Sequence, residues 1–226
     1  MGNRQLKKKI LALLKNEAFE KNLEEICRMP ARRAVNPLFS FFYNPDELIK
    51  WRAVTAMGAV VARLAHEDFE SARIVMRRLM WNLNDESGGI GWGSPEAIGE
   101  IMARQDRLAK EYAGILVSYI NPAGNFLEHE MLQRGVLWGL GRLAHVHPEL
   151  VKDAAAHLLP FMRSEDAVHR GLAAWVAGAI SSEITQLSLK YLVKDETRIR
   201  IFINMKMIDC TVGQLAVEAL AGVYHK

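Results

Sequence analysis

The feature that most constrains the fold is a repeat of apolar, alanine-rich segments at intervals of roughly forty residues. Four of these segments read WRAVTAMGAV, WGSPEAIGEI, RGVLWGLGRL and RGLAAWVAGA, and a fifth reads GQLAVEALAG. Aligning them places one small residue in a common column: Gly58, Gly99, Gly141, Ala177 (or Gly178) and Ala221. Each segment follows another apolar segment and a polar turn, so the pattern predicts stacked helix pairs.

A single helix pair cannot bury both of its apolar faces, so successive pairs stack and share a core. The small residue in each second helix allows the close approach that stacking needs. We therefore predict an all-α, right-handed α-solenoid of about five helix pairs. As a single domain, 1–226, it has a capping helix or helices at 1–29 and repeats at 30–66, 69–104, 105–146, 148–182 and 183–226.

Two of the second helices contain the runs AMGAVVARLA, Ala56 to Ala65, and GLGRLA, Gly139 to Ala144. Both runs resemble HEAT-like repeats of the bilin-lyase type, in which an alanine-rich run is followed by Leu-Gly and Leu. The Val-Arg pair that often opens the second helix of such repeats is not kept here. The resemblance spans nearly the whole chain and implies a fold, not an activity.

One segment departs from the helical pattern. TRIRIFINMKMIDCTV, residues 197–212, alternates in polarity and is rich in isoleucine, which is typical of β-strands. We expect a β-hairpin inserted in the last repeat, with its turn near residues 204–206. A cap that closes the end of the stack is the favoured role, and a dimerisation edge is the alternative.

Composition limits the class of protein. Hydrophobic residues make up 50% and charged residues 24% of the chain, which indicates a globular protein. The net charge of +3 does not by itself indicate a nucleic-acid binder. Residues 1–16 form a basic amphipathic pattern, for which a solvated face is favoured over a membrane or nucleic-acid contact. We expect a cytoplasmic protein without a membrane association.

A glycine-rich stretch, NDESGGIGWGSPE, separates the two helices of the second repeat. Ser94 is the expected N-cap of the following helix, with Pro95 in its first turn. The loop is neither a P-loop nor a dinucleotide-binding motif. A structural turn is favoured over a ligand loop. If it binds a ligand, the rim of the site consists of Asp85, Glu86, Gly88, Gly89 and Gly91.

Tryptophan and arginine side chains recur on one stripe of the second helices, opposite the stripe of leucine and valine. Aromatic and arginine side chains on a concave face are typical anchors for a partner. The candidate binding residues are Trp51, Trp92, Glu96, Arg134, Trp138, Arg142 and Arg170. We expect Trp92 and Trp138 to be solvent-exposed. The alternative for Trp51 and Trp175 is that they fill gaps between repeats, and Trp81 is expected in the core.

No metal-binding or catalytic motif is readable. A single His-Glu pair, His129-Glu130, is too little for the iron site of the HEAT-type hydroxylases. We therefore predict no cofactor, no metal and no catalytic residue. The favoured function is a non-catalytic scaffold that binds a protein or peptide on its concave face. The alternatives are an enzyme like the HEAT-like alkylpurine DNA glycosylases, which would bind nucleic acid, and a tetrapyrrole-binding lyase.

Overall fold

The structure is a computed structural model that describes residues 2–83 and 91–222. The chain divides into two compact units, residues 1–108 and 109–226, and each is considered by itself. Helices dominate both units, and the strands found in the described ranges form a two-stranded sheet near the C-terminus. The predicted fold class is therefore confirmed.

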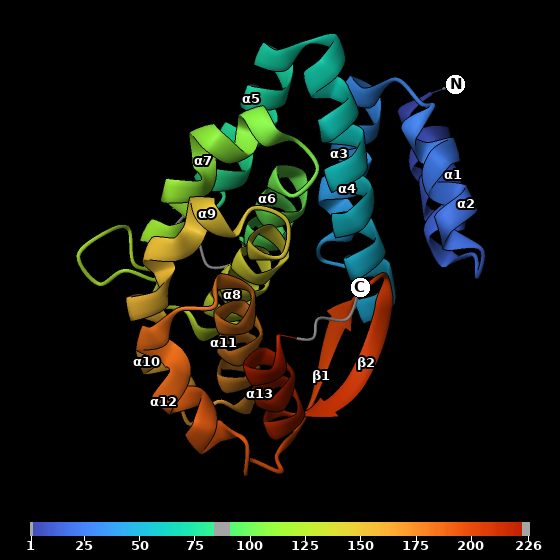
Figure 1. Ribbon diagram of the computed structural model, residues 1–226. Helices are drawn as coiled ribbons and strands as arrows, with labels where there is room; N and C mark the ends of the chain where they lie inside the picture. Colours follow the sequence, from blue (N-terminus) through green and yellow to red (C-terminus); the bar gives the residue numbers. More distant parts are fainter. Residues whose placement is uncertain (1, 84–90, 223–226) are drawn as a thin grey trace. The chain divides into compact units, whose positions relative to one another are not determined.

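The first unit consists of packed helices, most of them joined by short turns (Figure 1). They are α1 (Asn3–Lys15), α2 (Phe19–Cys27), α3 (Ala31–Phe41), α4 (Glu47–Glu67), α5 (Phe69–Trp81), α6 (Ser94–Met102) and the start of α7 (Asp106–Ser118). The long helix α4 packs against α3, α5 and α6 and is the centre of this unit.

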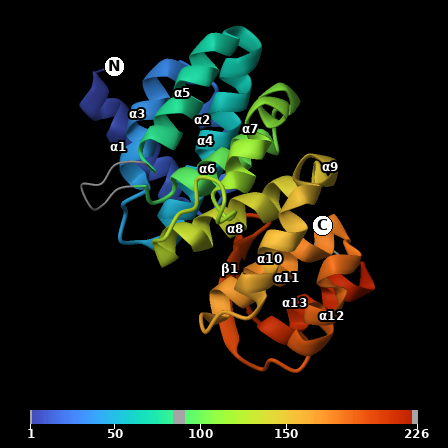
Figure 2. The same ribbon diagram turned by 90° about the vertical axis from the view of Figure 1, so that its left-hand side faces the viewer.

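The second unit continues from α7 and contains the hairpin (Figure 2). Its elements are α8 (Glu130–Ala144), α9 (Pro148–Val151), the 3-10 turn η1 (Lys152–Ala154), α10 (Ala155–Met162), α11 (Ala167–Ile180), α12 (Glu183–Leu192), β1 (Arg198–Ile203), β2 (Lys206–Thr211) and α13 (Val212–Ala221). Helix α11 packs against α8, α10 and α13 and is buried along most of its length.

Short polar side chains define where the helices begin. Asp46 caps α4 by accepting hydrogen bonds from the Leu48 and Ile49 N–H groups. Asp166 caps α11 in the same way, accepting from the Val168 N–H at 2.8 Å. A carboxylate at this position satisfies amide groups that have no partner within the helix and complements the helix dipole.

Glycines in the second helices allow these helices to touch. A Cβ atom added at Gly58 of α4 would overlap the side chain of Glu100 in α6, and one at Gly141 of α8 would overlap the Trp175 ring of α11. The close approach predicted for the small-residue column is therefore confirmed at these two positions. Consecutive second helices stack directly on each other in each unit.

The hairpin forms as predicted. Strands β1 and β2 are antiparallel, with Ile201 opposite Ile208, and Asn204 and Met205 turn the chain with φ values of 50° and 61°. Such positive φ values at both central residues give the twist that a two-residue hairpin turn needs. Strand β1 packs on α11, and β2 contacts α13. These contacts cover a face of the last helices.

The N-terminal helices cover one side of the first unit. Leu6, Ile10 and Leu14 are buried and lie one turn apart on the face of α1 that packs towards α2 and α3. At the end of α1, Arg52 donates hydrogen bonds to the carbonyl oxygens of Leu14 and Asn16 at 2.7 and 3.0 Å. This arginine, which the repeat pattern aligned near the start of a second helix, anchors the capping helix.

No helix within residues 2–83 and 91–222 combines the length and the apolar composition that crossing a bilayer requires.

The contact at Gly141 leads to a stability prediction. Gly141→Ala places a methyl group against the Trp175 ring, so the free energy of unfolding should fall by about 1–3 kcal/mol. Gly114→Ala is the matched control, because a Cβ atom there meets nothing within 4 Å and alanine favours the helix by about 0.5–1 kcal/mol. Urea unfolding of both variants tests the prediction, and equal stabilities would contradict it.

Candidate functional site

Two of the predicted site residues of the first unit, Trp51 and Glu96, lie on either side of Lys50 where α4 meets α6. The Lys50 ammonium group lies 3.4 Å from Glu96 Oε1 and 5.5 Å from the centre of the Trp51 ring. Trp51 is buried, and its indole N–H donates to Glu47 at 3.5 Å. Lys50, which the sequence analysis did not select, connects two of the predicted residues. It lies next to Trp51 in the chain but faces the neighbouring helix.

Glu96 lies in an unusual environment for a carboxylate. Its side chain is almost fully buried, and its Oε2 atom has no hydrogen-bond partner among the described residues. The hydroxyl of Ser94 is also buried without a hydrogen-bond partner in this part of the chain. Buried polar atoms without partners are costly and rare in native structures.

The start of α6 differs from the sequence prediction. Gly93, not Ser94, occupies the N-cap position, and Ser94 is already the first helical residue. Gly93 has a φ of 78°, and a Cβ atom there would lie 2.6 Å from the Phe42 ring. Only glycine fits this combination of backbone angle and space, so the chain turns at Gly93 and the N-cap moves one residue upstream of the expected serine.

Trp92, immediately before this turn, is 45% exposed and was correctly expected at the surface. Trp81 was expected in the core, and this prediction is wrong, because its side chain is 74% exposed. The buried stripe of α5 consists of Ala72, Val75 and Leu79, and Trp81 lies on the opposite side of the helix at 100° per residue.

The glycine loop is only partly visible. Asp85, Glu86, Gly88 and Gly89 lie outside the described residues. Gly91 is buried, and its carbonyl oxygen accepts a hydrogen bond from the Ser94 N–H at 2.9 Å. The described end of the loop is therefore part of the turn that leads into α6.

In the second unit, Trp138 is 3% exposed, so the prediction that it lies at the surface is wrong. Its indole N–H donates to the Phe202 carbonyl oxygen of β1 at 2.6 Å, and its ring packs against Trp175 and Phe202 with centroids 6.4 Å apart. The hairpin and α11 cover the face of α8 opposite its leucine stripe. The two-faced helix assumed from sequence is in fact buried nearly all round.

The predicted arginines of this unit are tied to aspartates of the next helix pair. Arg134 of α8 donates to Asp166 at 2.6 Å, and Arg170 of α11 donates to Asp195 at 2.7 Å. Arg142 lies near the end of α8 and is half-buried. The two aspartates were not predicted, because they lie 32 and 25 residues from their arginines and no local spacing indicates either pair.

These aspartates are stabilised as anions. Burial alone would raise the pKa of Asp166, but hydrogen bonds from Arg134 and from the Val168 N–H outweigh burial and hold the pKa below its ordinary value of 3.8. The pKa of Asp195 is lowered in the same way, with burial outweighed by Arg170 and Thr197. Both ion pairs join consecutive repeats and so stabilise the stacking of the helix pairs.

The groups that could carry chemistry are dispersed. Within residues 2–83 and 91–222, no three His, Cys, Asp or Glu side chains lie close enough to hold a metal ion. Burial raises the pKa of the Cys27 thiol and that of the Cys210 thiol, the latter to about 11, so both are protonated at neutral pH. His145 ends α8, where its Nδ1 atom lies 2.7 Å from the Gly141 carbonyl oxygen.

A cavity of about 230 Å³ lies in the second unit, between the loop after α7 and helix α10. Phe126 and Phe161 give it aromatic walls. The only imidazole in its lining, that of His169, already has Ser164 and the Glu130 carbonyl oxygen at 3.2 Å from its two nitrogens. The cavity thus provides mainly apolar contacts for a ligand and few polar groups that could react with one.

Comparisons with known proteins agree with this architecture. Residues 130–176 match the family model of the HEAT-like repeat. An uncharacterized protein of Archaeoglobus fulgidus is 26% identical over 202 residues, which cover 87% of this chain and 97% of that protein.

Solved structures show the same fold. An engineered protein superposes with a TM-score of 0.56 at 17% identity, covering 98% of this chain and 96% of that one. A designed armadillo repeat protein in complex with the peptide (KR)4 superposes with a TM-score of 0.52 at 15% identity, covering 95% and 98%.

The helix pairs, the match to the repeat model and the structural neighbours identify the chain as a HEAT-like repeat solenoid, similar in fold to armadillo-type repeat proteins. The match to the repeat model covers α8, α9, η1, α10 and most of α11, where the close contact at Gly141 and the Arg134–Asp166 pair occur.

The Arg134–Asp166 pair predicts a pH-dependent stability. Arg134→Leu should lower the free energy of unfolding at pH 7 by roughly 1–2 kcal/mol. Because the pKa of Asp166 is lowered in the folded state, its stabilisation is present above pH 3.8 and is lost as the pH falls through the folded-state value. The difference in the free energy of unfolding between the variant and the parent protein should therefore become smaller at acidic pH.

Urea unfolding between pH 7 and pH 2 measures this effect. Arg200→Leu is the control, since Arg200 and Asp209 form an exposed pair 3.8 Å apart, and its removal should cost less than about 0.5 kcal/mol. A loss for Arg134→Leu that stays constant from pH 7 to pH 2 would show that Asp166 is not the partner that matters.

Proposed function

We propose that the chain is a non-catalytic scaffold that binds a basic peptide or a basic segment of a protein on the second helices of its repeats. The observation that carries the proposal is Trp92, a tryptophan that is 45% exposed at the entrance of α6, in a fold that a designed armadillo protein uses in its complex with (KR)4. Exposed tryptophans are frequent anchors of binding interfaces.

The charges around Trp92 favour a basic ligand. Asp85 and Glu86 precede it in the sequence, and Glu96 follows it by four residues, with an Oε2 atom that has no hydrogen-bond partner among residues 2–83 and 91–222. An indole face attracts ammonium and guanidinium groups, and neighbouring carboxylates add to that attraction. We assign Trp92 as the anchor. Glu96 and the two acidic residues of the predicted loop, Asp85 and Glu86, supply the negative charge beside it.

The other predicted residues take supporting roles in this proposal. Arg134 and Arg170 hold consecutive helix pairs together through Asp166 and Asp195, and Trp51 packs beside Lys50. The nucleic-acid alternative needs cations that can release counterions from phosphates. Two of the arginines it relied on already have carboxylate partners, which supports the peptide over DNA. The repeat boundaries given above are part of the same proposal.

Trp92→Ala is the variant that tests the proposal. It should weaken binding of a fluorescent (KR)4 peptide by roughly ten-fold or more, as expected for loss of an aromatic anchor. Fluorescence anisotropy at about 50 mM salt measures this affinity. Trp81→Ala is the matched control, because Trp81 is also exposed but lies on the outer face of α5, and it should bind the peptide as the parent does.

Two outcomes would contradict the assignment. Equal losses in the two variants would show that the effect is not local to Trp92. Stronger binding of an acidic (DE)4 peptide than of (KR)4 would contradict the charge argument.

A further inference from the structure

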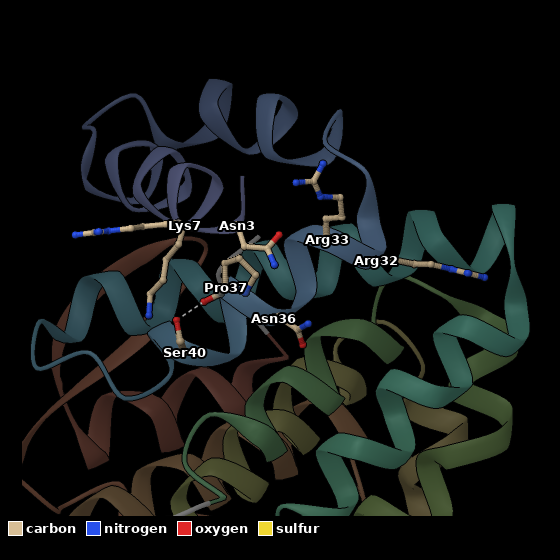
Figure 3. A pocket seen from close by; sticks show the side chains of 8 residues that line it. Asn3, Lys7, Arg32, Arg33, Asn36, Pro37 and Ser40 are labelled. Carbon is tan, nitrogen blue, oxygen red and sulfur yellow. Dashed lines mark hydrogen bonds between the residues drawn. The ribbon is translucent and has the colours of Figure 1, made fainter. Parts of the chain in front are cut away.

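A second surface of the first unit, between α1 and α3, is strongly basic. A cavity of about 480 Å³ opens between α1 and α3 (Figure 3). It is lined by Asn3, Arg4, Lys7, Arg32, Arg33, Asn36, Pro37 and Ser40. Four of these eight side chains are cationic, and none of the described residues that line the cavity is acidic.

The basic character begins in the sequence. Residues 1–16 contain five lysines and arginines and no aspartate or glutamate. Leu6, Ile10 and Leu14 fix the rotation of α1 by packing inward, which directs Arg4 and Lys7, one turn apart, towards the cavity. The hydrophobic stripe thus determines which cations of α1 face α3 and which, such as Lys8, do not line the cavity.

Several of the polar groups are held in place. Arg32 donates to Asp68 and, at 2.7 Å, to the Ser71 hydroxyl, so its guanidinium group is held away from the cavity and does not serve as a donor to the ligand. Lys7 lies 5.5 Å from the centre of the Phe41 ring. Figure 3 shows its side chain extending towards Ser40. Preorganised cations lose less conformational entropy when they bind a ligand.

One uncharged group, the Asn36 amide, also favours an anion. Arg78 donates to Asn36 Oδ1 at 2.5 Å, which leaves the amide NH2 of Asn36 as the group available to a ligand. The Ser40 hydroxyl donates to the Pro37 carbonyl oxygen within its own helix at 2.7 Å, so its proton is not available to a ligand. The Pro37 ring supplies an apolar surface between the charged side chains (Figure 3).

We propose that this cavity binds a small organic phosphate of about nucleotide size through Arg4 and Lys7, with the Asn36 amide as a further donor. Arginine, lysine and amide N–H groups are the donors that phosphate oxygens accept best. A volume of about 480 Å³ exceeds what a single phosphate ion fills and is within the range of pockets for small organic ligands. The residues are distinct from those proposed for the peptide, so the two proposals stand or fall separately.

Calorimetric titration of the full chain at about 50 mM salt, with EDTA present, tests the proposal with three probes. ATP should bind saturably at one site, pyrophosphate more weakly, and adenosine, which lacks phosphate, not measurably. Arg4→Gln and Lys7→Gln should each weaken ATP binding by roughly ten-fold, since each removes a charge-assisted hydrogen bond. Both side chains are exposed, and thermal unfolding checks that the variants stay folded.

Lys8→Gln is the matched control, because it removes the same charge from the same helix without touching the cavity. It should change the ATP affinity by less than about two-fold, as expected for a screened surface charge. If Lys8→Gln weakens ATP binding as much as Lys7→Gln does, the attraction is non-specific and the proposal is overturned. Absence of ATP binding, or tighter binding of a single-stranded oligonucleotide than of ATP, would also overturn it.

Discussion

The contact on which each unit depends is the direct stacking of one second helix on the next, with a glycine in place of a side chain. At Gly141 the Trp175 ring fills the space where a Cβ atom would be, and at Gly58 the chain of Glu100 does the same. The cost of a glycine inside a helix, about 1 kcal/mol, is offset by the apolar surface that this approach buries. Close stacking also explains why α8 and α11 are buried on almost every side.

Burial of the second helices determines which predicted residues can meet a ligand. Trp138 and Trp175 are buried in the packing between helices. Arg134 and Arg170 form ion pairs that join consecutive helix pairs. What remains for binding are side chains at helix entrances and on the outermost helices. Trp92 is at such an entrance, and the basic residues of α1 are on such a helix.

The fold was readable from the sequence because it follows from local patterns. The small-residue column, the alternation of residues 198–211 and the stripe of Leu6, Ile10 and Leu14 each report one element and its buried side. The burial of Trp138 could not be predicted from local patterns. It depends on a hairpin more than sixty residues later in the chain, where the Phe202 carbonyl oxygen accepts a hydrogen bond from the indole N–H of Trp138. Helical periodicity indicates that a helix has a second face but not what covers that face.

Pairing, more than charge itself, separates structural from functional arginines and lysines in this protein. Asp166 and Asp195 hold their arginines between helix pairs, and the lowered pKa of each aspartate shows that the ionised pair is the stable form. In the cavity between α1 and α3, Arg32 is also paired, with Asp68, whereas Arg4 and Lys7 of α1 line the cavity with no carboxylate among its described lining. Like charges one helical turn apart repel each other and destabilise the helix that carries them. An anion that neutralises them would remove this repulsion, so occupancy of the cavity and stability of the capping helix should be linked.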